Sequence, residues 1–128
     1  VDEEGTKKYG IIKVKRQVSD RLFEIEDMAE KPGPEKAFSD LGILGRYVFT
    51  PEIFEAIKHT PVDSRGEIQI TDAIKLLLQS QPVYGYLFEG KRYDCGNKLG
   101  FLEATIALAL KHPEFSSQLR ALIKPLLS

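Results

Sequence analysis

The sequence predicts an α/β domain in which helices pack in layers on a sheet. The chain has 128 residues, the size of one ordinary domain with a single core. Its hydrophobic fraction of 42% and charged fraction of 29% are typical of a globular protein. Stretches with the period of a strand alternate with stretches that have the period of a helix, and this alternation is the main evidence for the fold class.

Two β-rich stretches at the start of the chain are expected to form an antiparallel pair. Residues 9–17 contain Ile11, Ile12 and Val14, and residues 21–30 alternate apolar with acidic side chains. The short VSD segment between them is typical of a turn. The next ten residues contain two prolines and a glycine, so they are predicted to be a loop.

The middle of the chain predicts a central strand followed by two helices. Residues 41–49 are apolar and β-branched, which favours the strand. Thr50 is expected to cap a helix over 51–58, because Pro and Glu follow it in the first turn. Thr71 or Asp72 is expected to cap the second helix. The apolar face of that helix is formed by Ile74, Leu77 and Leu78.

The last third predicts a hairpin and two helices. Residues 82–94 are expected to form the hairpin, with its turn near 89–90. Asn97 can cap a longer helix that ends before Pro113, and a final helix is expected over 114–124. About five strands and four helices result. The side chains expected to face inward are Leu99, Leu102, Ile106, Leu110, Phe115, Leu119, Leu122 and Ile123.

Composition argues against several classes of function. The net charge is −1 and the pI about 6.2, so no basic field attracts nucleic acid or an anionic membrane. No apolar stretch approaches the ~20 residues of a membrane span, and the first residues are not expected to be a signal peptide. With one cysteine and two distant histidines, neither an internal disulfide nor a structural zinc site is expected. No glycine-rich phosphate loop is found.

The segment KRYDCGNKLG at 91–100 contains the single cysteine beside an acid. Asp94 would oppose thiolate formation at Cys95, and no histidine is near in sequence, so we expect Cys95 to be a small buried packing residue. Asp94 lies at the predicted C-terminal end of a strand, where ligands gather in α/β sheets, and a carboxylate there can bind Mg²⁺. A helix cap or loop carboxylate explains the same pattern equally well.

The Glu30-Lys31-Pro32 segment ends the second predicted strand. The carboxylate can accept hydroxyl hydrogens, and the amine suits a phosphate. Neighbours on a strand face opposite sides, but the following Pro and Gly could bring both side chains to one ligand. A solvated charged turn is the commoner explanation. Arg65 and Lys98 are further phosphate candidates, although a lone surface cation is usually only solvated.

Four segments in one order carry a family resemblance. They are YGII at 9–12, EKP at 30–32, SDLGILGRYVFTPEIF with GEIQITDAI at 39–54 and 67–75, and the long stretch at 82–115. From about Tyr9 onward, the chain resembles the C-terminal half of the bacterial UTP–glucose-1-phosphate uridylyltransferases (UDP-glucose pyrophosphorylases), within the sugar-1-phosphate nucleotidyltransferase family. The resemblance implies a Rossmann-like nucleotidyltransferase fold, with a mixed sheet flanked by helices.

The resemblance also implies an activity: transfer of UMP from UTP to glucose 1-phosphate, giving UDP-glucose and pyrophosphate, with Mg²⁺ as cofactor. The sugar-phosphate oxygen would attack the α-phosphorus in line, and the protein would position the reactants and stabilise charge. A related enzyme for another nucleotide or sugar, or a non-catalytic binding module, is the alternative. A homo-oligomer in the cytoplasm is expected, without nucleic-acid or membrane partners.

Position by position, the resemblance implies roles for particular residues. Gly10 would let the backbone approach the sugar, Glu30 would accept glucose hydroxyls, and Lys31 would bind the sugar phosphate. Asp94 would be one of two Mg²⁺-binding aspartates, so Lys31 and Asp94 are the candidate catalytic residues. The sugar pocket would be lined by Ile43 and Tyr47.

The sequence departs from the family pattern at two places. Asp40-Leu41-Gly42 replaces the usual Asn-Leu-Ala, and Arg65 replaces a frequent glycine. Thymidylyltransferase relatives have an arginine at that point which contacts the sugar phosphate; Lys98 is a further candidate for the same contact. The family's glycine-rich loop, uridine pocket and other metal aspartate are not found. Residues 1–128 are therefore expected to be the sugar-phosphate-binding part of a longer enzyme, inactive alone.

Overall fold

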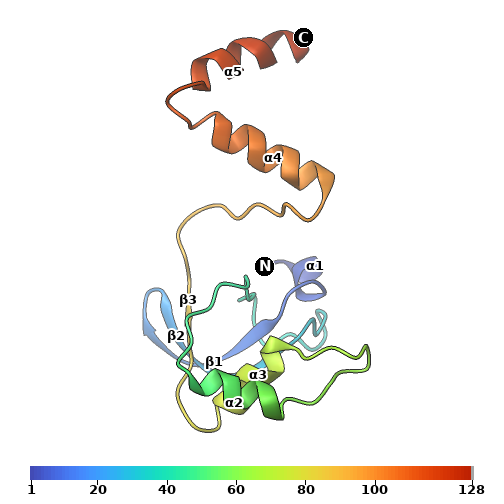
Figure 1. The fold of residues 1–128 in the computed structure, drawn as a ribbon. Helices are drawn as coiled ribbons and strands as arrows, with labels where there is room; N and C mark the ends of the chain where they lie inside the picture. The colour runs from blue at the N-terminus through green and yellow to red at the C-terminus, as the bar shows by residue number, and fades with distance from the viewer. Residues whose placement is uncertain (128) are drawn as a thin grey trace. The chain divides into compact units, whose positions relative to one another are not determined.

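The structure, a computed structural model, describes residues 1–127, which form two compact units that divide after Phe88 (Figure 1). The elements of the first unit are α1 (Glu3–Thr6), β1 (Ile11–Ser19), β2 (Leu22–Ala29), α2 (Glu52–His59), α3 (Ile70–Leu77) and β3 (Tyr84–Tyr86). Those of the second are α4 (Lys98–Ala109), α5 (Ser116–Ile123) and the 3₁₀ helix η1 (Lys124–Leu126). The α/β class is confirmed. The described residues contain three strands, fewer than the five or so that the sequence predicted.

The sheet has the order β1-β2-β3, and both pairs of neighbours are antiparallel. The predicted β1–β2 pair is confirmed. The resemblance implied a mixed sheet, whereas the strands that the structure describes are all antiparallel. In the β1–β2 ladder, Ile11 pairs with Ala29 and Ile12 with Met28, and bulges interrupt the register farther along. The pairing is regular at the end of the ladder next to Gly10 and Glu30, which directly precede Ile11 and follow Ala29.

The core lies between the sheet and two helices, which run beside each other in Figure 1. The sheet contributes Ile12, Ile25 and Met28, while α2 contributes one isoleucine and α3 contributes three side chains. The buried helical residues are Ile53, Ala73, Ile74 and Leu77. The predicted inner face of α3 is therefore confirmed, with Leu78 half-buried at its edge. This packing fixes α3 against β2.

The predicted central strand over 41–49 is wrong. Only its start joins the sheet, where Ile12 donates to the Leu41 carbonyl (3.1 Å) and Ile43 donates to the Gly10 carbonyl (2.8 Å). Gly45 then adopts a positive φ of 68°, and Val48 is fully exposed. A strand-like sequence forms a strand only where it can pack against neighbouring strands. Residues 44–49 pair with no strand of the described sheet, so they do not form one.

The predicted caps of α2 and α3 are also wrong. Neither helix has a side-chain cap, and the residues that precede them are Pro51 and Gln69. The Thr50 hydroxyl instead accepts a hydrogen bond from the Gln81 amide at 2.9 Å. The Thr71 hydroxyl is likewise engaged outside its own helix. Competing side-chain contacts therefore explain both misassigned caps.

In the second unit, Asn97 caps α4 as predicted, because its Oδ1 accepts a hydrogen bond from the Gly100 N–H at 2.8 Å.

The predicted hairpin over 82–94 is wrong: β3 pairs with β2, and residues 91–94 form no strand in the described chain. Most side chains expected to face inward are exposed, Leu99 to 77%, and only Ala104 is buried among the described residues of this unit.

Across residues 1–127, the structure contains no helix with the length and apolar character needed to cross a membrane.

We predict that Ile74→Ala lowers the free energy of unfolding by about 2–5 kcal/mol, because it leaves a cavity where α3 meets the sheet. Ile68→Ala is the matched control, since Ile68 is 52% exposed and Ile74 only 2% exposed. Urea denaturation followed by circular dichroism measures both. Equal losses in the two variants would contradict this assignment of the core.

Candidate functional site

Three of the predicted sugar-site residues meet at the end of the β1–β2 ladder. The Ile11–Ala29 pair places Gly10 beside Glu30. A Cβ added to Gly10 would lie 3.0 Å from Ile43 Cδ1 and 3.1 Å from Glu30 Oε2. Both distances are tighter than ordinary van der Waals contact, so any larger residue at position 10 would press on Ile43 and on the Glu30 carboxylate.

Thr71, at the start of α3, is a fourth member of this cluster. Its hydroxyl donates a 2.7 Å hydrogen bond to Glu30 Oε2, and the residue is only 2% exposed. The sequence predicted Thr71 only as one of two alternative helix caps, the other being Asp72. The signal that could have identified it was its place inside GEIQITDAI, one of the segments that carry the family resemblance.

Lys31 adopts a left-handed backbone conformation, with φ of 47°, which is strained for a residue with a side chain. It is the one such non-glycine residue in the described chain. Its N–H donates to the Tyr9 carbonyl (3.2 Å), and its Nζ lies 3.7 Å from Glu30 Oε1. The strand alternation that would separate the two side chains therefore breaks at Lys31 itself, before Pro32 and Gly33.

Tyr47 lies within the electrostatic influence of this cluster. Burial raises the pKa of the Tyr47 hydroxyl, and the negative charge of Glu30 raises that pKa further. Its ring stacks on Phe49 with centroids 5.1 Å apart. This stacking orients the Tyr47 ring, although residues 44–49 do not form a strand. Gly10, Glu30, Lys31 and Ile43 thus lie at one end of the sheet, and Tyr47 is linked to them only through the charge of Glu30.

Arg65 is bound by acids of its own loop. Its Nε and guanidinium NH2 group lie 3.1 and 3.0 Å from Asp63 Oδ2, and the NH2 group lies 3.4 Å from Glu67. Asp63 is the main cause of the raised Arg65 pKa, followed by Glu67, with a smaller contribution from Glu30. The direct partners of Arg65 are therefore residues of its own loop, and Glu30 contributes only a smaller electrostatic effect on its pKa.

Asp63 organises that loop. Its Oδ1 accepts the N–H groups of Arg65 (2.8 Å) and Glu67 (3.0 Å), and its Oδ2 accepts the Gln69 amide (3.0 Å). These donors, the Glu67 N–H first, hold the pKa of the Asp63 carboxyl well below its usual range. Gly66 supplies the positive φ of the turn. The position of Arg65 thus depends on an ionised Asp63.

In the second unit, Asp94 lies in a tight turn before α4, not at a strand end as predicted. Its Oδ1 accepts the Gly96 N–H at 3.0 Å, its Oδ2 lies 3.9 Å from the Arg92 guanidinium, and its side chain is 51% exposed. A Cβ on Gly100 would overlap the Asp94 carbonyl oxygen, so the helix approaches the turn closely. Since Asn97 is the cap, Asp94 is a loop carboxylate.

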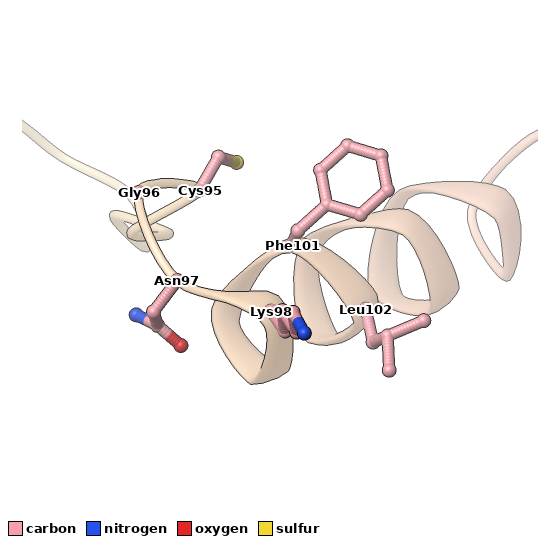
Figure 2. A pocket seen from close by; sticks show the side chains of 6 residues that line it. All are labelled: Cys95, Gly96, Asn97, Lys98, Phe101 and Leu102. Carbon is pink, nitrogen blue, oxygen red and sulfur yellow. The ribbon is translucent and has the colours of Figure 1, made fainter.

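Cys95 and Lys98 line a pocket at the start of α4 (Figure 2), together with Gly96, Asn97, Phe101 and Leu102. Cys95 is exposed, so the expectation of a buried packing residue is wrong. The reason is that no strand precedes it and little of this unit is buried. Lys98 occupies the first position of the helix and is exposed.

No group of three potential metal-binding side chains occurs among the residues that the structure describes. The half-exposed Asp94 carboxylate can nevertheless supply one hard oxygen ligand. Mg²⁺ typically binds through one or two carboxylates together with substrate phosphates. Among the described residues, Asp94 is therefore a single candidate ligand and does not by itself form a metal site.

Comparison with known proteins gives consistent results. Residues 1–110 match the family model described as nucleotidyl transferase. The chain is 47% identical to a UTP–glucose-1-phosphate uridylyltransferase of Staphylococcus epidermidis, over 98% of this chain and 43% of the relative. For the Bacillus subtilis enzyme of that name, the identity is 46% over 100% of this chain and 44% of the relative. The chain thus spans less than half the length of these relatives.

Solved structures agree. A UDP-glucose pyrophosphorylase complexed with UDP-glucose matches with a TM-score of 0.79 and 42% identity, covering 88% of this chain and 42% of that one. A UTP-bound UGPase from Acinetobacter baumannii matches with a TM-score of 0.82 and 34% identity, covering 96% of this chain and 42% of that one. Both resemblances include similar sequences as well as similar folds.

We predict that Asp63→Asn destabilises the protein at neutral pH but much less in acid. Folding lowers the pKa of Asp63, so its carboxylate stabilises the folded state above the unfolded pKa of about 3.9. That stability is lost as the pH falls through the lower, folded-state pKa. The difference in unfolding free energy between parent and variant should therefore shrink in strong acid.

Urea denaturation from neutral to acid pH measures this difference. Asp20→Asn, in the exposed β1–β2 turn, is the control and should change little at any pH. A loss in Asp63→Asn that does not vary with pH would show that the carboxylate charge is not the cause.

Proposed function

The chain belongs to the nucleotidyl transferase family, and from that premise we propose that it is the C-terminal, sugar-phosphate-binding part of a UTP–glucose-1-phosphate uridylyltransferase. The reaction is transfer of UMP from UTP to glucose 1-phosphate, which releases pyrophosphate. The observation that carries the proposal is the 46–47% identity, over nearly the whole chain, to relatives that bear this name. The coverage of less than half of each relative supports the assignment to one part of the enzyme.

The cluster around Glu30 suits glucose 1-phosphate. Ionised carboxylate oxygens accept hydrogen bonds from sugar hydroxyls, and the Lys31 ammonium attracts a phosphate. The two groups lie 3.7 Å apart, so one small ligand that carries both functions can reach them together. Gly10 would let the backbone approach the sugar, and Ile43, which lies beside Gly10, would supply a less polar wall to which Tyr47 is proposed to add.

Arg65 and Lys98 are proposed as additional phosphate contacts. Arg65 would share its guanidinium between Asp63 and the phosphate, which its several N–H donors allow. Lys98 is exposed at the first turn of α4, where the backbone N–H groups also favour an anion. Lys31 is the strongest of the three candidates because of its contact with Glu30.

Asp94 is proposed to bind Mg²⁺ as one of its protein ligands. Its Oδ1 is occupied by the Gly96 N–H, and its Oδ2 has a more distant partner in Arg92, so Oδ2 is the available oxygen. Mg²⁺, when bound, neutralises charge on the reacting phosphates. Lys31 and Asp94 thus remain the proposed catalytic residues, while the homo-oligomer and the cytoplasmic location remain predictions from the resemblance.

The proposal predicts UDP-glucose formation by the full-length protein that contains this chain, given UTP, glucose 1-phosphate and Mg²⁺. The product is measured by chromatography, with dTTP and other sugar 1-phosphates as competing substrates. A preference for dTTP would contradict the uridylyl assignment, and no turnover of any pair would favour a binding module. The isolated chain is expected to be inactive, so normal turnover by it would contradict its assignment as a part of the enzyme.

We predict that Asp94→Ala lowers turnover of the full-length protein by roughly 100-fold or more, because it removes a metal ligand. Folding should be preserved, since the side chain is half exposed. The matched control is Cys95→Ser, a change at the neighbouring exposed residue that should have a mild effect. Equal and severe losses in both variants would indicate that the segment has a structural role only. Turnover at saturating substrate and thermal unfolding are measured for each.

A further inference from the structure

We propose that Thr71 is a positioning residue that sets the orientation of the Glu30 carboxylate toward the sugar. This inference rests on the proposed function and deepens it, since the reaction above assigns no role to Thr71. The carrying observation is the 2.7 Å hydrogen bond from Thr71 Oγ1 to Glu30 Oε2. It joins two residues that are 41 positions apart in the sequence.

The donor belongs to a rigid element. Thr71 follows the first residue of α3, a helix held against the sheet by Ala73, Ile74 and Leu77, all nearly or fully buried. Thr71 itself is 2% exposed, and its β-branched side chain has few rotamers. A hydroxyl presented in this way cannot easily move to another partner. A hydrogen bond to a carboxylate is also stronger than one between neutral groups.

The bond makes the two carboxylate oxygens of Glu30 different. Oε2 is engaged by Thr71 and is close to Gly10, whose added Cβ would lie 3.1 Å away. Oε1 lies on the side of the Lys31 amine, at 3.7 Å. With Oε2 held, Oε1 has a fixed direction beside the amine. The side chain of Glu30 is 26% exposed, so a ligand can still reach it.

Fixing this carboxylate before the ligand arrives should strengthen binding of the sugar phosphate. A free glutamate side chain loses rotamer freedom when it binds a hydroxyl, and a pre-oriented one loses less. The effect should be confined to the sugar substrate, because the nucleotide is not expected to contact Glu30. Thr71 is therefore expected to act only through Glu30.

The test is made in the full-length protein with the substitution Thr71→Val, which removes the hydroxyl and keeps the shape. The KM for glucose 1-phosphate should rise about tenfold, while the KM for UTP stays within about twofold. Thr71→Ser keeps the donor and should restore the parent KM. Thr60→Val is the matched control: Thr60 is 6% exposed, and its hydroxyl donates to the Ala56 carbonyl at 2.8 Å, away from Glu30. It should leave both KM values unchanged.

A double-substitution cycle separates positioning from a general structural effect. On the background of Glu30→Gln, Thr71→Val should change the KM for glucose 1-phosphate by less than about twofold, because its partner is already altered. Independent, multiplicative effects would overturn the inference. If Thr71→Val does not fold, the comparison of Thr71→Ala with Thr71→Ser makes the same test.

The outcomes also distinguish this inference from the proposed function. An active parent whose KM for glucose 1-phosphate is unaffected by Thr71→Val overturns the inference alone. Equal rises in the KM values for both substrates also overturn it, since a general distortion would then explain the loss. A parent that does not form UDP-glucose overturns the proposed function and, with it, this inference.

Discussion

The register of the β1–β2 ladder is the constraint on which the candidate sugar site depends. Pairing of Ile12 with Met28 places both side chains in the core, and the same register places Gly10 beside Glu30. A slip by one residue would turn the apolar side chains of one strand to its other face. Each fully buried side chain of this size contributes roughly 1.5–3 kcal/mol. The core therefore holds the register, and the register holds the site.

That stability offsets a local cost at Lys31. A non-glycine residue in a sparsely populated backbone region costs about 1–3 kcal/mol, less than the combined burial of Ile12, Ile25 and Met28. The strained conformation brings the Lys31 amine to the carboxylate of its neighbour, which a regular strand would direct to the opposite face. The strain and the convergence of charges occur at the same residue, and local strain of this kind is concentrated at functional sites in proteins.

Features set by local interactions could be predicted from the sequence. Asn97 caps α4 through a residue three positions away, and the alternation of Phe23 to Glu26 is sufficient to identify β2. The failures involve distant partners. Residues 41–49 and 91–94 have strand-like sequences, but a strand needs a neighbour, and the sequence does not show which segments lack one. The Thr71–Glu30 bond was missed for the same reason, since nothing near Thr71 in the sequence indicates an acceptor.

The two candidate regions differ in what maintains them. The turn at Asp94 is held by Gly96, Asn97 and the close approach of Gly100, all within seven residues, so its geometry is largely a property of that short segment. The arrangement at Glu30 combines β1, β2, α3 and the segment at Ile43, so it exists only while the first core is intact. Partial unfolding of the first unit would therefore remove the sugar-phosphate cluster while leaving the local geometry of Asp94 intact. The candidate sugar site thus depends on tertiary structure, whereas the candidate metal ligand depends on a local turn.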